Sequence, residues 1–439
     1  MPHSDVRLGV VGTGYVGLTT GACFAHLGYR VVCGDIDQRK VDLLNDGLIP
    51  IVEDGLAEVV EAARESGMLE FVFGSQAAAR DADIVFLCVP TPQGEDGSAD
   101  LSYIEQAARE IAPILRPGAV VVNKSTVPVG STIAVERVLG RPDVSVVSNP
   151  EFLREGTAVG DFLSPERVVI GAANPEAAQR VAALYSTIDT KIITTDPASA
   201  ETIKYAANGF LAMKISFVNA VAAMCEHVGA DVAAVVDGIG SDTRIGSRFL
   251  SPGPGWGGSC FPKDSRALVK IADDHGYDFS LMRGVISVND EQRHRMVDKI
   301  ARAVGRHPSD LSGVKVAALG LTFKAGTDDL RESPALRVVA DLRTAGATVA
   351  GYDPTTVGEL SPIQEATLAD TVVCQNVDDA VDGADVVCIF TEWPEFTDID
   401  LERLAVRVGA GTTVVDTRNL LEPVQVKAVG LRYDGVGRR

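Results

Sequence analysis

The sequence predicts an α/β protein with two doubly wound parallel-sheet domains, joined by a long central helix and a helical middle domain. Short apolar runs alternate with helix-length spacers through residues 1–198, and the same alternation returns in residues 313–439. Strands that alternate with helices form parallel sheets, whose ligands gather at the carboxyl ends of the strands. Residues 199–304 have helical spacing instead, and the Gly- and Pro-containing stretch 305–313 is the expected linker.

Composition limits the possible partners. With 439 residues, 46% of them apolar, the chain can bury the cores of several domains. Its formal net charge of −20 argues against nucleic acid or an anionic membrane as a partner. The seven cysteines include no Cys-x-x-Cys pair, so neither a disulfide framework nor a metal site is indicated. Without a signal peptide or a membrane-spanning apolar run, we expect a cytoplasmic protein with no membrane association.

The first strand and the turn after it predict a dinucleotide site. Leu8–Val11 is followed by Gly12-Thr-Gly14-Tyr-Val-Gly17, and the next strand ends in Asp35. In such a Rossmann-like unit the glycines permit a tight turn, the helix N-terminus faces the pyrophosphate, and the acid accepts from ribose hydroxyls. Asp35 would repel a 2′-phosphate, which favours NAD over NADP. The predicted cofactor contacts here are Gly12, Gly14, Tyr15, Val16, Gly17, Asp35 and Lys40.

Polar residues follow the later strands of the same domain. They are Thr91, Ser125-Thr126 and the run Asn149-Pro-Glu151-Phe-Leu-Arg-Glu155. Because the strand ends form the ligand edge of the sheet, these are candidate site residues. Glu151 and Glu155 are four apart and would share one helix face. The alternative is that Asn149-Pro150 merely begins a helix whose acids complement its dipole.

The stretch Ser251–Asp264 predicts a reactive cysteine. Its glycines, Gly257 among them, let the backbone approach a ligand closely. Cys260 is followed by Lys263 and Asp264, a cation and a proton acceptor that suit a nucleophilic thiol. The alternative is a surface loop in which the cysteine is only a small hydrophobic residue.

A helix of about 30 residues is predicted from Asp196-Pro197 to His227, roughly 45 Å long. It is apolar on most sides, so we expect it to be buried as a spine between domains, or in a subunit interface. Lys204 and Asn208 are its polar exceptions and share a face. A lysine there requires an anion, unless its head reaches water.

The last third repeats the first domain without its glycine turn. The runs Val314–Gly320 and Thr348–Asp353 parallel the first two strands, but the fingerprint is reduced to Gly320-Leu-Thr-Phe-Lys324. This pattern predicts a second nucleotide-type sheet. Lys324, Arg331 and Arg418 stand where anionic phosphates would lie.

Taken together, these motifs resemble the nucleotide-sugar 6-dehydrogenases nearly end to end. The motifs are Gly12-x-Gly14-x-x-Gly17, Ser125-Thr-Val-Pro128, Asn149-Pro-Glu-Phe-Leu-x-Glu155, Lys204-x-x-x-Asn208, Gly257-Gly-Ser-Cys-Phe-Pro-Lys-Asp264, and Phe323-Lys324 with Arg331-Glu-Ser. The form around Cys260 is similar to that of the UDP-glucose branch of the family.

The resemblance implies that the primary alcohol of a UDP-sugar, UDP-glucose by this branch, is oxidised to a carboxylate with two NAD. The intermediates would be a thiohemiacetal and a thioester on the cysteine. The implied catalytic residues are Cys260, Lys204, Asn208, Asp264, Thr126 and Glu151. The implied substrate contacts are Phe152, Leu153, Glu155, Arg244, Arg248, Gly257, Phe323, Lys324 and Arg418. Further NAD contacts are Thr91, Thr126, Glu155, Lys263 and Arg331.

The resemblance also implies a homodimer, with Arg248 reaching across the dimer contact. Three alternatives stay open. One is a dehydrogenase of another nucleotide sugar, a UDP-N-acetylhexosamine or GDP-mannose. Another is a single-step hydroxy-acid dehydrogenase, which would need neither Cys260 nor a second sheet. The third is a non-enzymatic NAD-binding regulator, which would have no reason to combine Cys260 with Lys204, Asn208 and Glu151.

Overall fold

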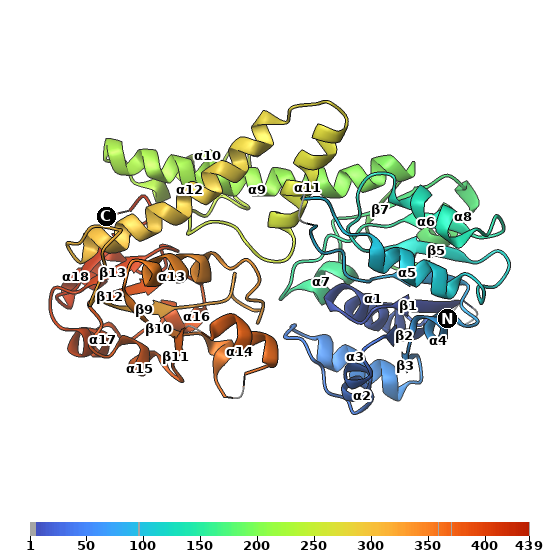
Figure 1. Cartoon of the computed structure of the whole chain (residues 1–439), viewed down its shortest axis with the longest axis horizontal. Helices are drawn as coiled ribbons and strands as arrows, with labels where there is room; N and C mark the ends of the chain where they lie inside the picture. The colour runs from blue at the N-terminus through green and yellow to red at the C-terminus, as the bar shows by residue number, and fades with distance from the viewer. Residues whose placement is uncertain (1–5, 95–96, 359, 370, 439) are drawn as a thin grey trace. The chain divides into compact units, whose positions relative to one another are not determined.

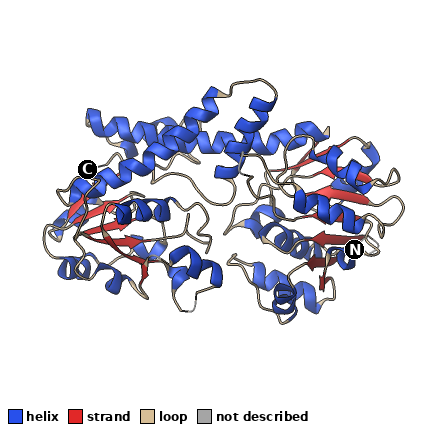
Figure 2. Ribbon diagram, in the orientation of Figure 1, coloured by secondary structure: helices blue, strands red, loops and turns tan. Residues whose placement is uncertain are grey.

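The computed structural model describes residues 6–94, 97–358, 360–369 and 371–438 (Figure 1). The chain forms two compact units. The first contains Met1–Ala207 and Lys270–His275, and the second contains Asn208–Val269 and Gly276–Arg439. Each unit holds one sheet with helices packed on both of its faces (Figure 2).

The sheet of the first unit has eight strands in the order β3-β2-β1-β4-β5-β6-β7-β8. Their bounds are β1 Arg7–Val11, β2 Arg30–Asp35, β3 Leu69–Phe73, β4 Ile84–Leu87, β5 Val120–Asn123, β6 Ser145–Ser148, β7 Arg167–Ala172 and β8 Lys191–Thr195. The first six strands are parallel, as predicted, and the order reverses between β1 and β4, where ligands bind in such sheets. The prediction of a wholly parallel sheet is wrong at β7, which pairs antiparallel with β6. Such edge additions are common on parallel sheets.

Two apolar cores flank this sheet. Val10 packs in one core and the next residue, Val11, packs in the other, because successive side chains of a strand face opposite sides. The helices are α1 Tyr15–His26, α2 Gln38–Asn45, α3 Leu56–Glu65, α4 Ser75–Ala79, α5 Ser102–Ile111, α6 Ser131–Leu139, α7 Ala158–Leu163 and α8 Pro175–Ala183.

The second unit contains the predicted second sheet. Its strands are all parallel, in the order β11-β10-β9-β12-β13-β14, the same order as the first six strands of the first unit. Their bounds are β9 Lys315–Leu319, β10 Thr348–Tyr352, β11 Val372–Val373, β12 Val386–Ile389, β13 Thr413–Asp416 and β14 Arg432–Gly435. The helices are α10 Val232–Gly240, α12 Ser280–Ala303, α13 Pro334–Thr344, η1 Pro354–Thr356, α14 Pro362–Leu368, α15 Val377–Val381, α16 Pro394–Thr397, α17 Leu401–Val408 and α18 Pro423–Ala428. Helix α11 Phe261–Asp274 begins in the second unit, and its residues from Lys270 onward belong to the first.

The long helix α9 spans Pro197–Val228 and contributes residues to both units. Asp196 caps it by accepting from the Ser199 N–H at 2.8 Å, as the Asp-Pro signal predicted. By length and composition α9 could cross a membrane, but half of its most apolar window is buried inside the protein, as in a core helix.

One face of α9 is exposed in the single chain, which leaves open the expectation of a subunit interface. Phe210, Phe217, Met224 and Val228, spaced by seven, seven and four residues, are 55–68% exposed. This spacing places them along one stripe of the helix. The stripe of these four residues is called the α9 apolar stripe below.

Candidate active site

The turn between β1 and α1 fits a dinucleotide. A Cβ on Gly17 would lie 1.9 Å from the Gly12 carbonyl oxygen, so helix and turn pack closely only with glycine. A Cβ on Gly14 would meet nothing within 4 Å, and no side chain in the described part of the chain caps α1 at Gly14. The first N–H groups of a helix have no partner within the helix, and such groups are the donors with which helix termini bind phosphate. The predicted residues thus suit the pyrophosphate of NAD.

Asp35 is held as a carboxylate at the end of β2. Its Oδ2 accepts from the Thr13 N–H at 2.8 Å and the Thr13 hydroxyl at 2.7 Å, and its Oδ1 accepts from the Asp37 N–H at 3.0 Å. Lys40 pairs with it at 3.4 Å. Burial raises the pKa of Asp35, but these hydrogen bonds and the Lys40 charge outweigh it and hold the pKa below its ordinary value. An anion at this position suits ribose hydroxyls and repels a 2′-phosphate.

The acid of the second sheet that corresponds to Asp35 is Asp353, and its carboxylate is hydrogen-bonded to groups of the protein itself. Oδ2 of Asp353 accepts from the N–H of Leu321, the N–H and hydroxyl of Thr322, and the indole of Trp393 at 2.7–3.1 Å. Its Oδ1 accepts from the N–H and hydroxyl of Thr355. A carboxylate has about four lone-pair sites, so these six donors saturate Asp353.

Glu53 connects the cofactor turn to the loop after β6. Its carboxylate accepts from the Tyr15 hydroxyl and, at 2.6 Å each, from the N–H groups of Gly156 and Ala158. The Tyr15 hydroxyl also lies 3.1 Å from the Arg154 carbonyl oxygen. Burial and the bond to Glu53 raise the pKa of Tyr15, so the phenol keeps its proton. Sequence reasoning missed Glu53, because a lone acid 38 positions from Tyr15 gives no local signal.

The loop itself corrects a prediction. Glu151 and Glu155 do not share a helix face, since the chain is irregular from residue 149 until α7 begins at Ala158. Side-chain carboxylates capture N–H groups that a helix would need. Glu151 accepts from the Leu153 N–H at 2.6 Å, and Asp161 accepts from the Arg154 N–H at 2.9 Å.

Lys204 of α9 meets an anion in the first unit. Its Nζ lies 2.9 Å from Oε1 of Glu151 and 2.7 Å from the Glu151 carbonyl oxygen, and both side chains are about 95% buried. Burial raises the pKa of Glu151, but the Lys204 charge and its hydrogen bond outweigh burial, so the pKa lies below the ordinary value. The ring of Phe152 lies 5.4 Å from the same ammonium group. Lys204 therefore does not send its head to water.

The second unit brings together Asn208, Lys263 and Asp264. Asp264 is fully buried; its Oδ2 accepts from the Asn208 amide and its Oδ1 from Lys263, both at 2.6 Å. Cys260 is partly exposed and directly precedes α11, whose Asp264 N–H binds the Cys260 carbonyl at 2.9 Å. The N-terminus of a helix stabilises a thiolate, so the position suits a nucleophile.

The glycine-rich loop before Cys260 packs against the loop that joins β9 to α13 in the second unit. A Cβ on Gly257 would lie 2.1 Å from the Glu332 carbonyl oxygen, and one on Gly258, where φ is +79°, would lie 2.7 Å from the Phe323 ring. These two positions therefore exclude other residues. Trp256, between Gly255 and Gly257, lies in an apolar core cluster, and its indole N–H donates to the Ser216 hydroxyl at 2.9 Å.

The lysine and arginine residues that were predicted to bind the substrate differ in burial. Arg418 is partly buried, donating to the carbonyl oxygens of Phe390 at 2.7 Å and Phe323 at 3.3 Å, and Lys324 lies 5.8 Å from the Phe323 ring. Arg244 and Arg248 instead lie on the exposed segment after α10. Arg331 is also largely exposed and pairs with Asp329. In the first unit, Thr91 donates to the Thr126 carbonyl at 2.9 Å.

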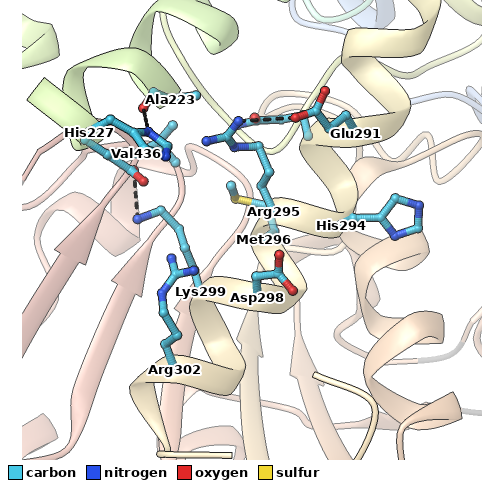
Figure 3. A pocket seen from close by; sticks show the side chains of 12 residues that line it. Ala223, His227, Glu291, His294, Arg295, Met296, Asp298, Lys299, Arg302 and Val436 are labelled. Carbon is cyan, nitrogen blue, oxygen red and sulfur yellow. Dashed lines mark hydrogen bonds and ion pairs between the residues drawn. The ribbon is translucent and has the colours of Figure 1, made fainter. Parts of the chain in front are cut away.

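A cavity of about 490 Å³ in the second unit contains none of the predicted site residues (Figure 3). It lies among α9, α12 and the C-terminal segment, and its charged side chains are mostly paired: Lys299 with Glu226 at 2.9 Å and Arg295 with Glu291 at 3.3 Å. Among the described residues, no group of three or more His, Cys, Asp or Glu side chains is arranged to hold a metal ion.

The fold and these residues define an NAD-linked oxidoreductase with a second nucleotide-type domain and a cysteine at a helix N-terminus. Residues 6–189 match the NAD binding domain of the UDP-glucose/GDP-mannose dehydrogenase family, residues 198–291 its central domain and residues 317–423 its UDP binding domain. The chain belongs to this family.

Proteins that are similar to this chain over nearly its whole length carry names from the same family. UDP-glucose 6-dehydrogenase of Rhizobium meliloti is 44% identical, over 99% of this chain and 100% of the relative. UDP-glucose 6-dehydrogenase TuaD of Bacillus subtilis is 43% identical, over 98% and 93%. The structure of a UDP-glucose dehydrogenase from Pyrobaculum islandicum matches with a TM-score of 0.91 and 37% identity, over 100% of this chain and 98% of that one.

Proposed function

We propose that the chain is an NAD-dependent UDP-glucose 6-dehydrogenase that converts UDP-glucose to UDP-glucuronate. The observation that carries the proposal is Cys260 at the start of α11, four residues before a buried Asp264 that binds Asn208. The full-length relatives named for UDP-glucose support the substrate, whereas a UDP-D-ManNAc dehydrogenase structure from Pyrococcus horikoshii is only 28% identical. Other nucleotide sugars remain the alternative to be tested.

Oxidation of a primary alcohol to a carboxylate removes four electrons and needs one water. Bound NAD, held by the β1–α1 turn and Asp35, supplies the hydride acceptor for each two-electron step. The Cys260 thiolate adds to the aldehyde carbon, giving a thiohemiacetal, and loss of a hydride and a proton converts that adduct to a thioester. Water then cleaves the carbon–sulfur bond, releasing the carboxylate and restoring the thiol.

The neighbouring residues have distinct roles in this scheme. Lys204 and Asn208, one turn apart on α9, stabilise the oxyanion that recurs at the reacting carbon. Glu151, a carboxylate beside Lys204, accepts a proton from water during hydrolysis. Asp264 and Thr126 hold water for proton transfer near Cys260, and Glu155 binds substrate.

We assign UDP-sugar contacts to Phe323, Lys324 and Arg418 of the C-terminal domain, with Phe152, Leu153, Arg244 and Gly257. Residues 1–198 then form the NAD domain, 199–304 the helical middle domain and 313–439 the UDP-sugar domain. Lys263 and Arg331 are assigned to NAD.

We further infer a homodimer through the α9 apolar stripe. Large exposed apolar side chains in a row mark protein interfaces more often than open surface, and an α-helix paired with a second copy of itself would cover all four. Arg248 is assigned to this contact. All seven cysteines are free thiols, which suits the reducing cytoplasm.

The decisive experiment counts NADH per UDP-glucose consumed, across a panel of UDP- and GDP-sugars. Two NADH with little free aldehyde are expected, while one NADH with an accumulating ketone would assign the protein to the single-step dehydrogenases. Cys260→Ala, which cannot form an adduct, should turn over negligibly. Cys260→Ser should give at most a stoichiometric burst, because a serine ester hydrolyses far more slowly than a thioester. Steady-state rates near wild type in Cys260→Ala would refute the covalent mechanism.

A further inference from the structure

A second lysine, Lys124, is buried in the first unit close to the Glu151–Lys204 pair. It directly follows β5 and is only 4% exposed. Its Nζ donates to Oδ1 of Asn149 at 3.1 Å and to the Tyr185 hydroxyl oxygen at 3.3 Å, and lies 5.9 Å from the Phe162 ring. The groups that accept these hydrogen bonds are neutral, although burying an ammonium group is costly without a carboxylate.

The contact to Asn149 fixes the start of the Glu151 loop. The Asn149 amide donates to the Val169 carbonyl at 2.8 Å, so its Oδ1 faces the two donors Lys124 and Tyr185, the latter at 2.7 Å. The Asn149 N–H also binds the Asn123 carbonyl at 2.9 Å, next to Lys124 in sequence. Because only Pro150 separates Asn149 from Glu151, this network sets where the Glu151 backbone begins.

The charge of Lys124 also affects the pKa of Glu151, which forms an ion pair with Lys204. The titratable groups that face it are Glu151, Lys204, Cys88 and Tyr185. Burial lowers the pKa of Lys124 to about 8, with the Glu151 charge opposing the shift and the Lys204 charge adding to it. Burial raises the pKa of Glu151, and the contacts to Lys204 and the Leu153 N–H lower it. The Lys124 charge lowers it further, by a smaller amount. Burial raises the pKa of Cys88 to about 12, so that thiol stays neutral.

We propose that Lys124 is a positioning residue of the active site, which anchors the Asn149-Pro150-Glu151 turn and adds a second positive charge that keeps Glu151 ionised. Sequence reasoning missed it, although a lysine two residues after the apolar run Ala119–Val122 was a signal of a buried cation. The inference rests on the proposed role of Glu151 as the base for hydrolysis.

The first test compares the pH dependence of kcat in wild type, Lys124→Met and Tyr185→Phe. Lys124→Met removes the charge and the hydrogen bonds, whereas Tyr185→Phe removes the bonds of the Tyr185 hydroxyl to Asn149 and Lys124 and keeps the charge. The acidic limb of kcat should move upward by about one pH unit in Lys124→Met, which means about tenfold less activity on that limb. Tyr185→Phe should leave the limb in place. Equal losses in both variants with an unmoved limb would overturn the proposal, because a purely structural role predicts that result.

The second test does not depend on turnover. A lysine whose folded pKa of about 8 lies below its unfolded value of roughly 10.4 binds more protons in the unfolded chain between those values. Its contribution to stability therefore rises with pH through this window. The difference in Tm between wild type and Lys124→Met should therefore shift in favour of wild type as the pH is raised from about 8 to about 10. Exposed Lys191→Met is the matched control and should show no such change.

The two tests separate the possible failures. If Glu151→Gln retains the acidic limb of wild type, Glu151 is not the base for hydrolysis. The Tm difference then remains as the only test of whether Lys124 is a buried, titrating lysine. If the Tm difference between wild type and Lys124→Met does not change with pH, Lys124 does not titrate in this window and the charge argument is refuted.

Discussion

Glu201 offers a direct test of how α9 is held in the first unit. This side chain, one turn before Lys204, is 2% exposed and serves as a cap for the separate helix α6. Its carboxylate accepts from the Gly130 N–H at 2.6 Å, the Thr132 N–H at 2.9 Å and the Thr132 hydroxyl at 2.7 Å. Glu201→Ala leaves the two buried donors of Thr132 without their acceptor.

The magnitude follows from those donors. Each unsatisfied buried group costs about 1–3 kcal/mol, so two cost roughly 2–6 kcal/mol. Burial raises the pKa of Glu201 despite its hydrogen bonds, so the charged carboxylate is itself costly and the cost lies at the lower end of the range, about 2–3 kcal/mol. For a unit of about two hundred residues this corresponds to a Tm lower by about 5–10 °C.

Thermal unfolding followed by circular dichroism measures the change. Glu136→Ala, on the exposed side of α6, is the matched control and should shift Tm by little more than 1 °C, or about 0.5 kcal/mol. Since the folded pKa of Glu201 is raised, its stabilising contribution is fully present below the unfolded pKa and is lost as pH rises through the folded pKa. The penalty should therefore be larger at acidic than at neutral pH. A Glu201→Ala Tm equal to that of Glu136→Ala would refute the capping argument.

Three further outcomes are expected. Asp35→Ala should narrow the preference for NAD over NADP by about tenfold, in kcat/KM measured with both cofactors, because one charge-assisted contact to the ribose is lost; a wild type that prefers NADP would contradict the assignment of Asp35. Glu151→Gln should accumulate a covalent adduct on Cys260, visible in the intact mass, whereas Glu155→Gln should mainly raise KM; the reverse pattern would exchange their roles. Phe217→Glu should shift the light-scattering mass from dimer to monomer, while Val406→Glu, at an exposed apolar position on α17, should not; an unchanged mass would exclude the α9 apolar stripe as the interface.

Local chemistry explains which predictions succeeded. The tight β1–α1 turn and the Asp-Pro start of α9 depend on neighbours only a few residues away, so the sequence alone predicts them. The helix predicted at Glu151 and Glu155 failed because Asp161 and Glu53 capture its N–H groups, and Glu53 lies about 100 positions away. Lys124 was missed for the same reason, since its partners Asn149 and Tyr185 come from two other parts of the first unit.

The saturated Asp353 has a consequence for the order of events. Because its own neighbours occupy the Asp353 carboxylate, Asp353 cannot accept from a ribose as Asp35 is proposed to do, and the proposed mechanism has one NAD site per chain, at Asp35. A four-electron oxidation then requires that spent NADH leave and fresh NAD enter halfway through each catalytic cycle. During this exchange a free aldehyde would be lost to solvent. In the proposed mechanism, the Cys260 adduct tethers the half-oxidised sugar while the cofactor is replaced.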